Sequence, residues 1–458
     1  MFFAKIKSKI AELFLVNTLP LLRYISNRQI IFLTYIAEKI LIKQDPIVNK
    51  AIKQIREYFR EDHPSIELVR RILKDLSPQC KRKLLKNFFV NAIFKGVTKS
   101  KEYAQRYGFN PPWFLVLSPT MRCNLNCVGC STRRYTKDDD LSISLIDRIL
   151  NEAKEMGIYF IVTQGGEMFV YEEMLEVYKK HSDVYFQVYT NGTLIDKKMA
   201  STLAKLGNVA PMISLEGFQE TTDRRRGKGV FKKVMQAMDN LREEGCFFGA
   251  SVTQTRNNTE EILSDEFFNL LYKKGCFVIW FFQFLPIGKD PDLDLMATPQ
   301  QRHQLYLKIQ DIRARLPIFI GDFWNDGPFV GGCIAAGRRY VHINNKGDVE
   351  PCAFVHFALD NIKEKSLREA LNSVFFKFLR QLQPFNQGNL LVPCMIIDQP
   401  EVLRQAVKES GAHPTHEGAE LILDGKISLG LDEYAREIQR ITLPIWEKIK
   451  DKAVKWPT

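Results

Sequence analysis

Three absences limit what this chain of 458 residues can be. No apolar run approaches the ~20 residues that a membrane-spanning helix needs. The first apolar stretch is interrupted by Lys and Glu and lacks a small-residue cleavage motif, so we expect no secretory signal peptide. The composition shows neither the low hydrophobicity of a disordered chain nor a collagen-like repeat. We therefore expect a globular protein of two or three domains in the reducing cytoplasm.

Positive charge is concentrated at one end of the chain. The net charge is +12, and residues 1–110 contain 22 Lys and Arg against 9 Asp and Glu. Phe3, Ile6 and Ile10 recur at helical spacing there, which predicts basic amphipathic helices. Such helices can lie on an anionic membrane, so we expect peripheral association with its inner face. The alternative is a helical cap with solvated charges. No nucleic-acid-binding motif is present, so no nucleic acid partner is expected.

From Pro111 onward, apolar runs alternate with helical stretches. The runs predict six strands at residues 113–117, 158–162, 184–189, 209–215, 247–252 and 278–284. The stretches between them predict helices at residues 144–156, 171–181, 197–206, 231–244 and 259–274. This alternation is typical of βα units around a parallel sheet. In parallel barrels the chemistry sits at the C-terminal ends of the strands.

Three cysteines, Cys123, Cys127 and Cys130, lie directly after the first predicted strand. Thiolates are soft ligands that suit iron–sulfur clusters or zinc. A structural zinc site is closed by four ligands, and no fourth Cys or His lies near this triplet. Disulfides are the weaker alternative in a reducing compartment. A cubane cluster has four irons, so three cysteines leave one iron open to another ligand.

The ends of the later strands also carry candidate binding residues. They are Gly165, Gly166 and Glu167 after the second strand, Thr190 and Asn191 after the third, Ser214 and Glu216 after the fourth, and Gln283 and Phe284 after the sixth. Taken singly, the glycine pair and the Thr-Asn-Gly stretch are ordinary turn signals. The basic run at residues 224–229 is a weak candidate phosphate loop, because no Lys-Ser/Thr follows it.

In combination, these motifs resemble the radical S-adenosylmethionine (radical SAM) superfamily over roughly residues 112–395. The resemblance implies a partial (β/α)6 TIM-type barrel and a [4Fe–4S] cluster whose open iron chelates S-adenosylmethionine. It further implies that Glu167 holds the amino group of S-adenosylmethionine, that Ser214 lies near its carboxylate, and that Gln283 and Phe284 lie near the adenine. Glu216 is the candidate catalytic residue, as a proton acceptor or as a hydrogen-bond anchor. Gly129 replaces an aromatic residue that is common in relatives, so we expect Phe284 to stack on the adenine.

A second cluster region is expected beyond residue 320. Cys333 and Cys352 frame a predicted hairpin at residues 341–349, and Cys394 follows. This pattern resembles a shortened, twitch-type SPASM domain, in which these three cysteines would bind an auxiliary iron–sulfur cluster. His342, His356 and Asp398 are nearby in the sequence as candidates for a fourth ligand, and the alternative is three buried free cysteines. Cys80, Cys246 and Cys276 are predicted to be core residues.

The expected organisation is a basic helical region (1–110), a radical SAM barrel (111–300), a twitch/SPASM-like domain (301–400) and a helical tail (401–458). The resemblance implies reductive cleavage of S-adenosylmethionine and abstraction of hydrogen from an unactivated C–H bond. A low-potential donor such as flavodoxin or ferredoxin is then a partner. The basic N-terminal region and the aromatic sixth strand favour a membrane lipid as substrate. The alternatives are a peptide or protein maturase and a non-catalytic iron–sulfur electron carrier.

Overall fold

The computed structural model describes residues 26–41, 53, 56–131, 135–288, 291–385 and 388–452. The amphipathic pattern expected at residues 3–14 lies outside the described residues. The described N-terminal helices are α2 (Asn27–Leu41), α4 (Pro64–Asp75), α5 (Pro78–Lys83), the π-helix η2 (Leu84–Lys95) and α6 (Gly96–Tyr107). Within the described part of the chain, no helix is both long enough and apolar enough to cross a bilayer.

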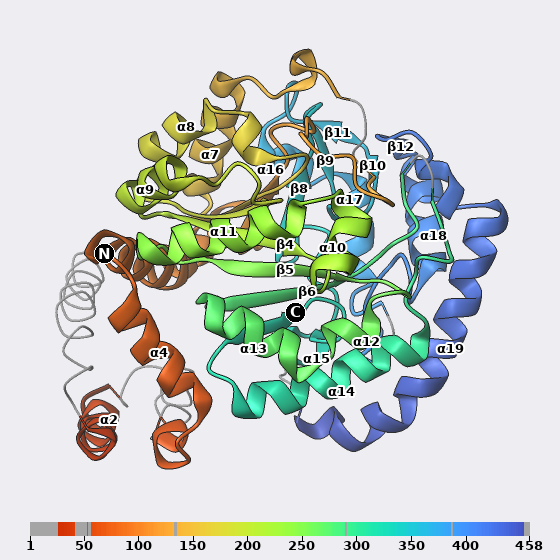
Figure 1. Ribbon diagram of the computed structural model, residues 1–458. Coiled ribbons are helices and arrows are strands. Elements are labelled where there is room, and N and C mark those ends of the chain that lie inside the picture. Colours follow the sequence, from red (N-terminus) through yellow and green to blue (C-terminus); the bar gives the residue numbers. More distant parts are fainter. Residues whose placement is uncertain are drawn as a thin grey trace.

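A curved parallel sheet forms the centre of the molecule (Figure 1). Its strands are β1 (Phe114–Leu117), β2 (Phe160–Thr163), β3 (Tyr185–Thr190), β4 (Val209–Leu215), β5 (Gly249–Gln254), β6 (Val278–Gln283) and β7 (Phe319–Asp322). Each strand pairs in parallel with the next along the chain. The α/β partial-barrel prediction is confirmed, and β7 continues the sheet beyond the expected boundary at residue 300.

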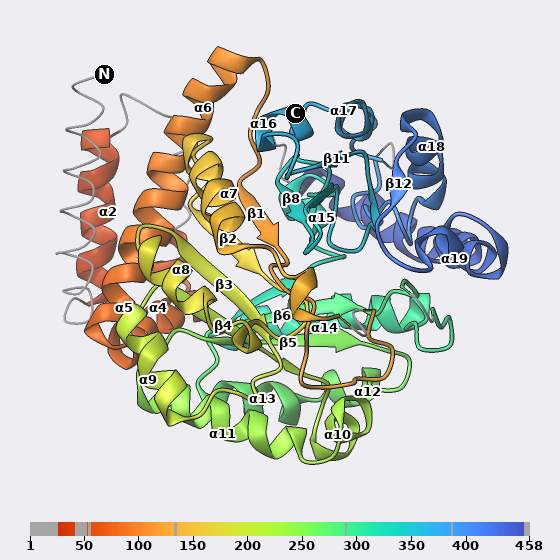
Figure 2. The same cartoon turned by 90° about the horizontal axis from the view of Figure 1, so that it is seen from above.

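Helices cover the outer face of this sheet, as seen in Figure 2. They are α7 (Ile143–Glu155), α8 (Met174–Lys180), α9 (Lys197–Leu206), α10 (Gln219–Arg226), α11 (Val230–Glu243), α12 (Thr259–Ile262), α13 (Asp265–Lys274) and α14 (Pro299–Arg315). The single helix predicted at 259–274 is wrong, because the side chain of Ser264 accepts a hydrogen bond from the N–H of Phe267 and starts a new helix there. Cys80, Cys246 and Cys276 are buried, as predicted.

The C-terminal part closes the side of the barrel next to β1. Its elements are α15 (Gly327–Val330), β8 (Tyr340–Ile343), β9 (Asp348–Glu350), β10 (Phe357–Ala358), β11 (Asp360–Asn361), α16 (Leu367–Leu371), α17 (Val374–Gln381), α18 (Pro400–Ser410), β12 (His413–Pro414), α19 (Gly425–Ile449) and the short 3₁₀ turns η5 (Ala419–Ile422) and η6 (Lys450–Lys452). Strand β8 pairs in parallel with β1 and forms the predicted hairpin with β9. The C-terminal segment is thereby joined to the barrel through one continuous sheet.

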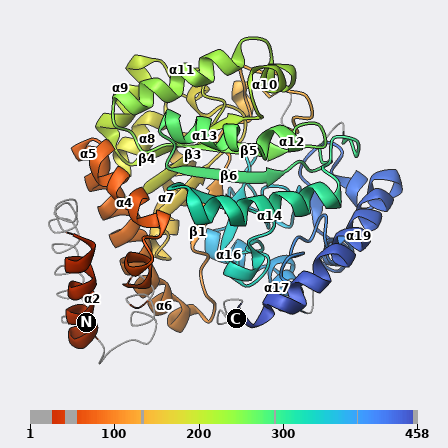
Figure 3. The same cartoon turned by 60° about the horizontal axis from the view of Figure 1, so that its bottom comes forward.

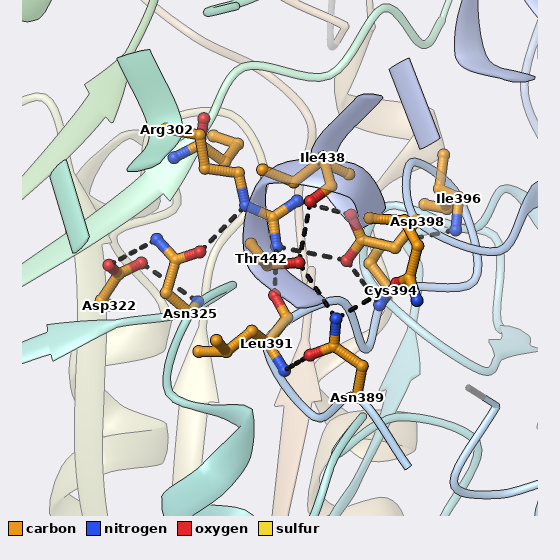
Figure 4. A network of polar contacts seen from close by, with 12 residues as sticks. Arg302, Asp322, Asn325, Asn389, Leu391, Cys394, Ile396, Asp398, Ile438 and Thr442 are labelled. Atoms are coloured by element: carbon orange, nitrogen blue, oxygen red, sulfur yellow. Dashed lines mark hydrogen bonds and ion pairs between the residues drawn. The ribbon is translucent and has the colours of Figure 1, made fainter. Parts of the chain in front are cut away.

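Helix α14 of the barrel packs against α19 of the C-terminal segment (Figure 3). Beneath this contact, the fully buried Arg302 of α14 forms an ion pair with the fully buried Asp398 (Figure 4). The other Asp398 oxygen accepts a hydrogen bond of 2.9 Å from the N–H of Cys394. Arg302 also donates to the side-chain oxygen of Asn325 and to the carbonyl of Leu391. This network holds the Cys394 loop against the barrel.

We expect Arg302→Leu to lower the free energy of unfolding by about 3–5 kcal/mol, because it leaves the Asp398 carboxylate buried and unpaired. Arg440→Leu is the matched control, since it removes an exposed ion pair with Glu437 and costs about 0–1 kcal/mol. Denaturant unfolding of both variants measures the difference. Equal costs would show that the buried pair does not hold the two parts together.

Candidate active site

The cysteine loop lies at the C-terminal end of β1. Cys123, Cys127 and Cys130 all line a cavity of about 280 Å³. The N–H of Val128 donates to the carbonyl of Arg225 at 2.8 Å, which fixes the loop against the end of α10. Gly129 has φ = +70°, a left-handed conformation that glycine adopts without strain. The loop therefore presents its three thiols to one space.

The sulfur atoms sit in a partly desolvated setting. The N–H of Leu125 donates to the Cys123 sulfur at 3.4 Å, and the Asn191 side-chain amide approaches the same sulfur at 3.7 Å. Burial raises the pKa of the Cys123 and Cys127 thiols. Metal binding requires the thiolate, so positive charge from a bound cluster would have to offset this desolvation. Three soft ligands around one cavity, with amide donors to sulfur, fit an iron–sulfur cluster.

The Gly165-Gly166 turn packs directly on the start of the cysteine loop. The N–H of Gly166 donates to the carbonyl of Thr120 at 3.1 Å, and the N–H of Glu167 donates to the carbonyl of Arg122 at 2.7 Å. A Cβ atom on Gly166 would lie 2.0 Å from the carbonyl oxygen of Arg122. Gly166 therefore lies in close contact with the protein backbone, and both glycines also line the cavity.

Glu167 lies behind the cavity wall and is fully buried. Its carboxylate accepts hydrogen bonds from the Thr190 hydroxyl at 2.7 Å, the Asn191 N–H at 2.7 Å and the Phe169 N–H at 3.1 Å. Burial raises its pKa, and these hydrogen bonds oppose that effect. Thr190 and Asn191 do line the cavity. The geometry differs from the expectation that Glu167 faces a bound amino group, since this side chain holds two wall residues in place.

Glu216 is likewise fully buried and forms ion pairs with Arg225 and Arg226. Burial opposes its ionisation, but the two arginines outweigh that effect and lower the pKa of Glu216. Both arginines line the cavity, whereas the carboxylate lies behind them. Of the two roles expected for Glu216, this arrangement favours the hydrogen-bond anchor over the proton acceptor, because a carboxylate stabilised in its charged form is a poor base. It also accounts for the basic run that follows β4.

Phe284 occupies the space next to Gly129. A Cβ atom on Gly129 would come within 2.8 Å of the Phe284 ring, so a larger residue there would displace the ring. Phe284, Gln283 and Ser214 all line the cavity, as expected from their places at the strand ends. Position 129 has no aromatic side chain, and the Phe284 ring from the end of β6 occupies the adjacent space instead.

The cavity is also lined by polar residues that sequence reasoning did not assign to this site. The Tyr135 hydroxyl lies 2.7 Å from Nδ1 of His416, whose ring packs edge-on against His356. Burial lowers the pKa of His416 to about 4, so its imidazole is neutral at physiological pH. Nδ1 of His356 is buried and has no hydrogen-bond partner among the described residues. Tyr135 and His416 lie 281 positions apart in the chain, so no local spacing could have revealed this wall.

His342 belongs to the same wall and links two strands. Its Nε2 lies 2.7 Å from the Ser118 hydroxyl after β1, and its Nδ1 lies 2.5 Å from the carboxylate of Glu350 on β9. Asn344 donates to the other Glu350 oxygen at 3.1 Å. This chain of hydrogen bonds ties the hairpin to the barrel at the edge of the cavity.

Cys333, Cys352 and Cys394 line a second, larger cavity of about 740 Å³. The Tyr340 hydroxyl donates to the Cys352 sulfur at 2.7 Å, and the Ile396 N–H donates to the Cys394 sulfur at 3.4 Å. Burial raises the pKa of Cys352 to about 11 and that of Cys394 to about 12. Three cysteines brought together from widely separated segments, with donors aimed at sulfur, fit an auxiliary iron–sulfur cluster better than three unrelated core residues.

The candidate fourth ligands are engaged elsewhere. Asp398 pairs with Arg302, His342 bonds Ser118 and Glu350, and His356 lies on the wall of the smaller cavity. Among the described residues, no three His, Cys, Asp or Glu side chains are grouped closely enough to hold a single metal ion. A cubane does not need such a group, because each thiolate binds a different iron.

Two family models match the chain. The model described as the radical SAM superfamily matches residues 117–264, and one described as an iron–sulfur cluster-binding domain of the SPASM type matches residues 333–395. These ranges contain the first and the second cysteine triplet.

Mycofactocin maturases are among the curated relatives. The protein from Mycolicibacterium smegmatis is 32% identical over 263 residues, which cover 54% of this chain and 66% of the relative. The protein from Mycobacterium ulcerans is 30% identical over 264 residues, covering 54% of this chain and 70% of the relative. The matches therefore span about two thirds of these relatives' lengths.

One solved structure, of histidine-tagged anSMEcpe with bound AdoMet, shares the fold. Its TM-score is 0.51 at 17% sequence identity, and the match covers 75% of this chain and 97% of that one.

We expect Glu167→Gln to weaken S-adenosylmethionine binding by about tenfold or more, since a buried hydrogen bond to a charged group is worth about 1.5–3 kcal/mol. The amide places a donor where the carboxylate accepts from Asn191 or Thr190, so these wall residues shift. Anaerobic calorimetric titration of the reconstituted protein measures the dissociation constant. The exposed Glu172→Gln is the matched control and should bind normally. Unchanged binding by Glu167→Gln would mean that this carboxylate does not shape the site.

Proposed function

The chain belongs to the radical SAM superfamily and carries a SPASM-type iron–sulfur domain, and from that premise we propose that it is a maturase that abstracts hydrogen from a C–H bond of a peptide or protein. The observation that carries the proposal is the pairing of two cysteine triplets, each on its own cavity. The two cavities adjoin, because Tyr189, Phe282 and Phe354 line both.

Cys123, Cys127 and Cys130 would hold the [4Fe–4S] cluster, and Cys333, Cys352 and Cys394 the auxiliary cluster. The first cluster would supply the electron for reductive cleavage of S-adenosylmethionine, the chemistry that the superfamily uses to abstract hydrogen. The chain's own residues would bind and orient S-adenosylmethionine and the substrate. Gly165, Gly166, Thr190, Asn191 and Ser214 form the wall beside the cysteine loop, and Gln283 and Phe284 form the wall at the end of β6.

A peptide substrate is supported by the polar wall that contains Tyr135, His356 and His416. Every peptide unit that leaves water needs a partner for its N–H and C=O groups. Tyr135, Asn345, His356 and His416 all line that part of the cavity and offer such partners. Two curated relatives that share 32% and 30% identity with the chain over 54% of its length are maturases by name. This wall favours a peptide over the lipid expected from the sequence.

The lipid substrate expected from the sequence has less support. No reported relative is named for lipid chemistry, and the amphipathic pattern at residues 3–14 lies outside the described residues. Peripheral contact with an anionic membrane and a flavodoxin or ferredoxin as electron donor remain proposals. The electron-carrier alternative does not account for the Gly165-Gly166 turn or the walls around it.

Isotope transfer into 5′-deoxyadenosine tests the peptide proposal. Peptide and lipid fractions from deuterated cells are incubated separately with reduced protein and S-adenosylmethionine, and the 5′-deoxyadenosine is analysed by mass spectrometry. We expect deuterium from the peptide fraction and its loss after protease treatment of that fraction. Cys123→Ala serves as the blank for radical formation. Deuterium from the lipid fraction alone would contradict the proposal.

A further inference from the structure

The larger cavity extends well beyond its three cysteines into the barrel. It is lined by residues from the first halves of four strands: Phe114 of β1, Phe160 of β2, Trp280 of β6 and Phe319 of β7. These residues lie at the end of the sheet opposite the cysteine loop, because the strands are parallel. The volume of about 740 Å³ lies within the ~300–1,000 Å³ typical of ligand pockets. We call this space the chamber.

The lining of the chamber is mainly apolar. Aromatic and aliphatic side chains dominate its lining, including Val116 and Val162, which pair across β1 and β2. Polar residues also line it: Arg313 and Asp326 form an ion pair of 2.6 Å, and Gln187 is hydrogen-bonded. The amide of Gln187 donates to the Tyr189 hydroxyl at 3.1 Å and accepts from the indole N–H of Trp280 at 3.3 Å. This part of the wall therefore satisfies its own hydrogen bonds.

The chamber and the smaller cavity beside it therefore suit different ligands. Beside the aromatic residues at the strand starts, a peptide backbone would lose hydrogen bonds to water without replacing them, which is unfavourable. A hydrocarbon chain has no such groups and gains by leaving water. Cys333, Cys352 and Cys394 are three of the many lining residues, so an auxiliary cluster bound to them would leave the aromatic residues at the strand starts to another occupant.

We propose that the chamber binds the hydrocarbon chain of a fatty-acyl lipid. The chain would run between the aromatic residues at the strand starts and the shared residues Tyr189, Phe282 and Phe354, where the chamber meets the smaller cavity. The proposal goes beyond peptide maturation and does not rest on it, because it concerns binding alone.

Fluorescence titration with cis-parinaric acid, a long-chain fatty acid, tests the chamber on the full-length holoprotein. We expect saturable binding with one site per chain, displaced by saturated fatty acids. Val162→Phe fills the chamber from β2 and should weaken binding by about tenfold or more. Val374→Phe makes the same change at an exposed position of α17 and should leave binding unchanged. Iron content and thermal midpoint establish that each variant is folded.

A second variant reports on the site even if Val162→Phe does not fold. Trp280→Ala enlarges the chamber, so the fatty acid that competes best should become longer, whereas Val374→Phe should keep the wild-type chain-length preference. Absence of saturable binding would overturn the proposal. So would binding that neither chamber variant alters, or displacement by an apolar peptide but not by fatty acids.

Discussion

The candidate site depends on one backbone contact, between the Gly165-Gly166 turn and the start of the cysteine loop. Two N–H groups of the turn donate to carbonyls of Thr120 and Arg122, and a Cβ atom on Gly166 would overlap the second carbonyl. Any side chain there would push the loop away from β2. The position of Cys123, one residue after Arg122, follows from this contact. Because position 166 has no space for a Cβ atom, glycine is required there, and this close contact fixes where the three thiols line the cavity.

Two buried carboxylates fix further residues of the cavity wall. Glu167 holds Thr190 and Asn191, and Glu216 holds Arg225 and Arg226, while neither carboxylate lines the cavity itself. Burying a charge is costly unless it is paired or hydrogen-bonded, and each of these charges meets that requirement. The side chains that face the cavity are therefore held from behind. In the C-terminal part, the Arg302–Asp398 pair holds the Cys394 loop in place in the same way.

Much of the fold could be predicted from the sequence because its signals are local. Alternating apolar runs identified β1 to β6, and the cysteine spacing identified the loop after β1. Side-chain direction was harder to predict, because burial of Glu167 and Glu216 depends on which neighbours surround them. The wall formed by Tyr135, His356 and His416 could not be predicted, since its members meet only through the fold. Ser264 is a capping residue that could have indicated the helix break, but the apolar periodicity around it favours one continuous helix.

In this account, Cys123, Cys127 and Cys130 hold the cluster that activates S-adenosylmethionine. Iron content and 5′-deoxyadenosine formation, measured together on anaerobically reconstituted protein, test it most directly. The wild type should hold about eight irons, four in each cubane. Replacing these three cysteines by Ala should leave about four irons and no 5′-deoxyadenosine. The matched variant lacking Cys333, Cys352 and Cys394 should also keep about four irons, bound in this case by the first triplet. Formation of 5′-deoxyadenosine by the variant without Cys123, Cys127 and Cys130 would contradict the account.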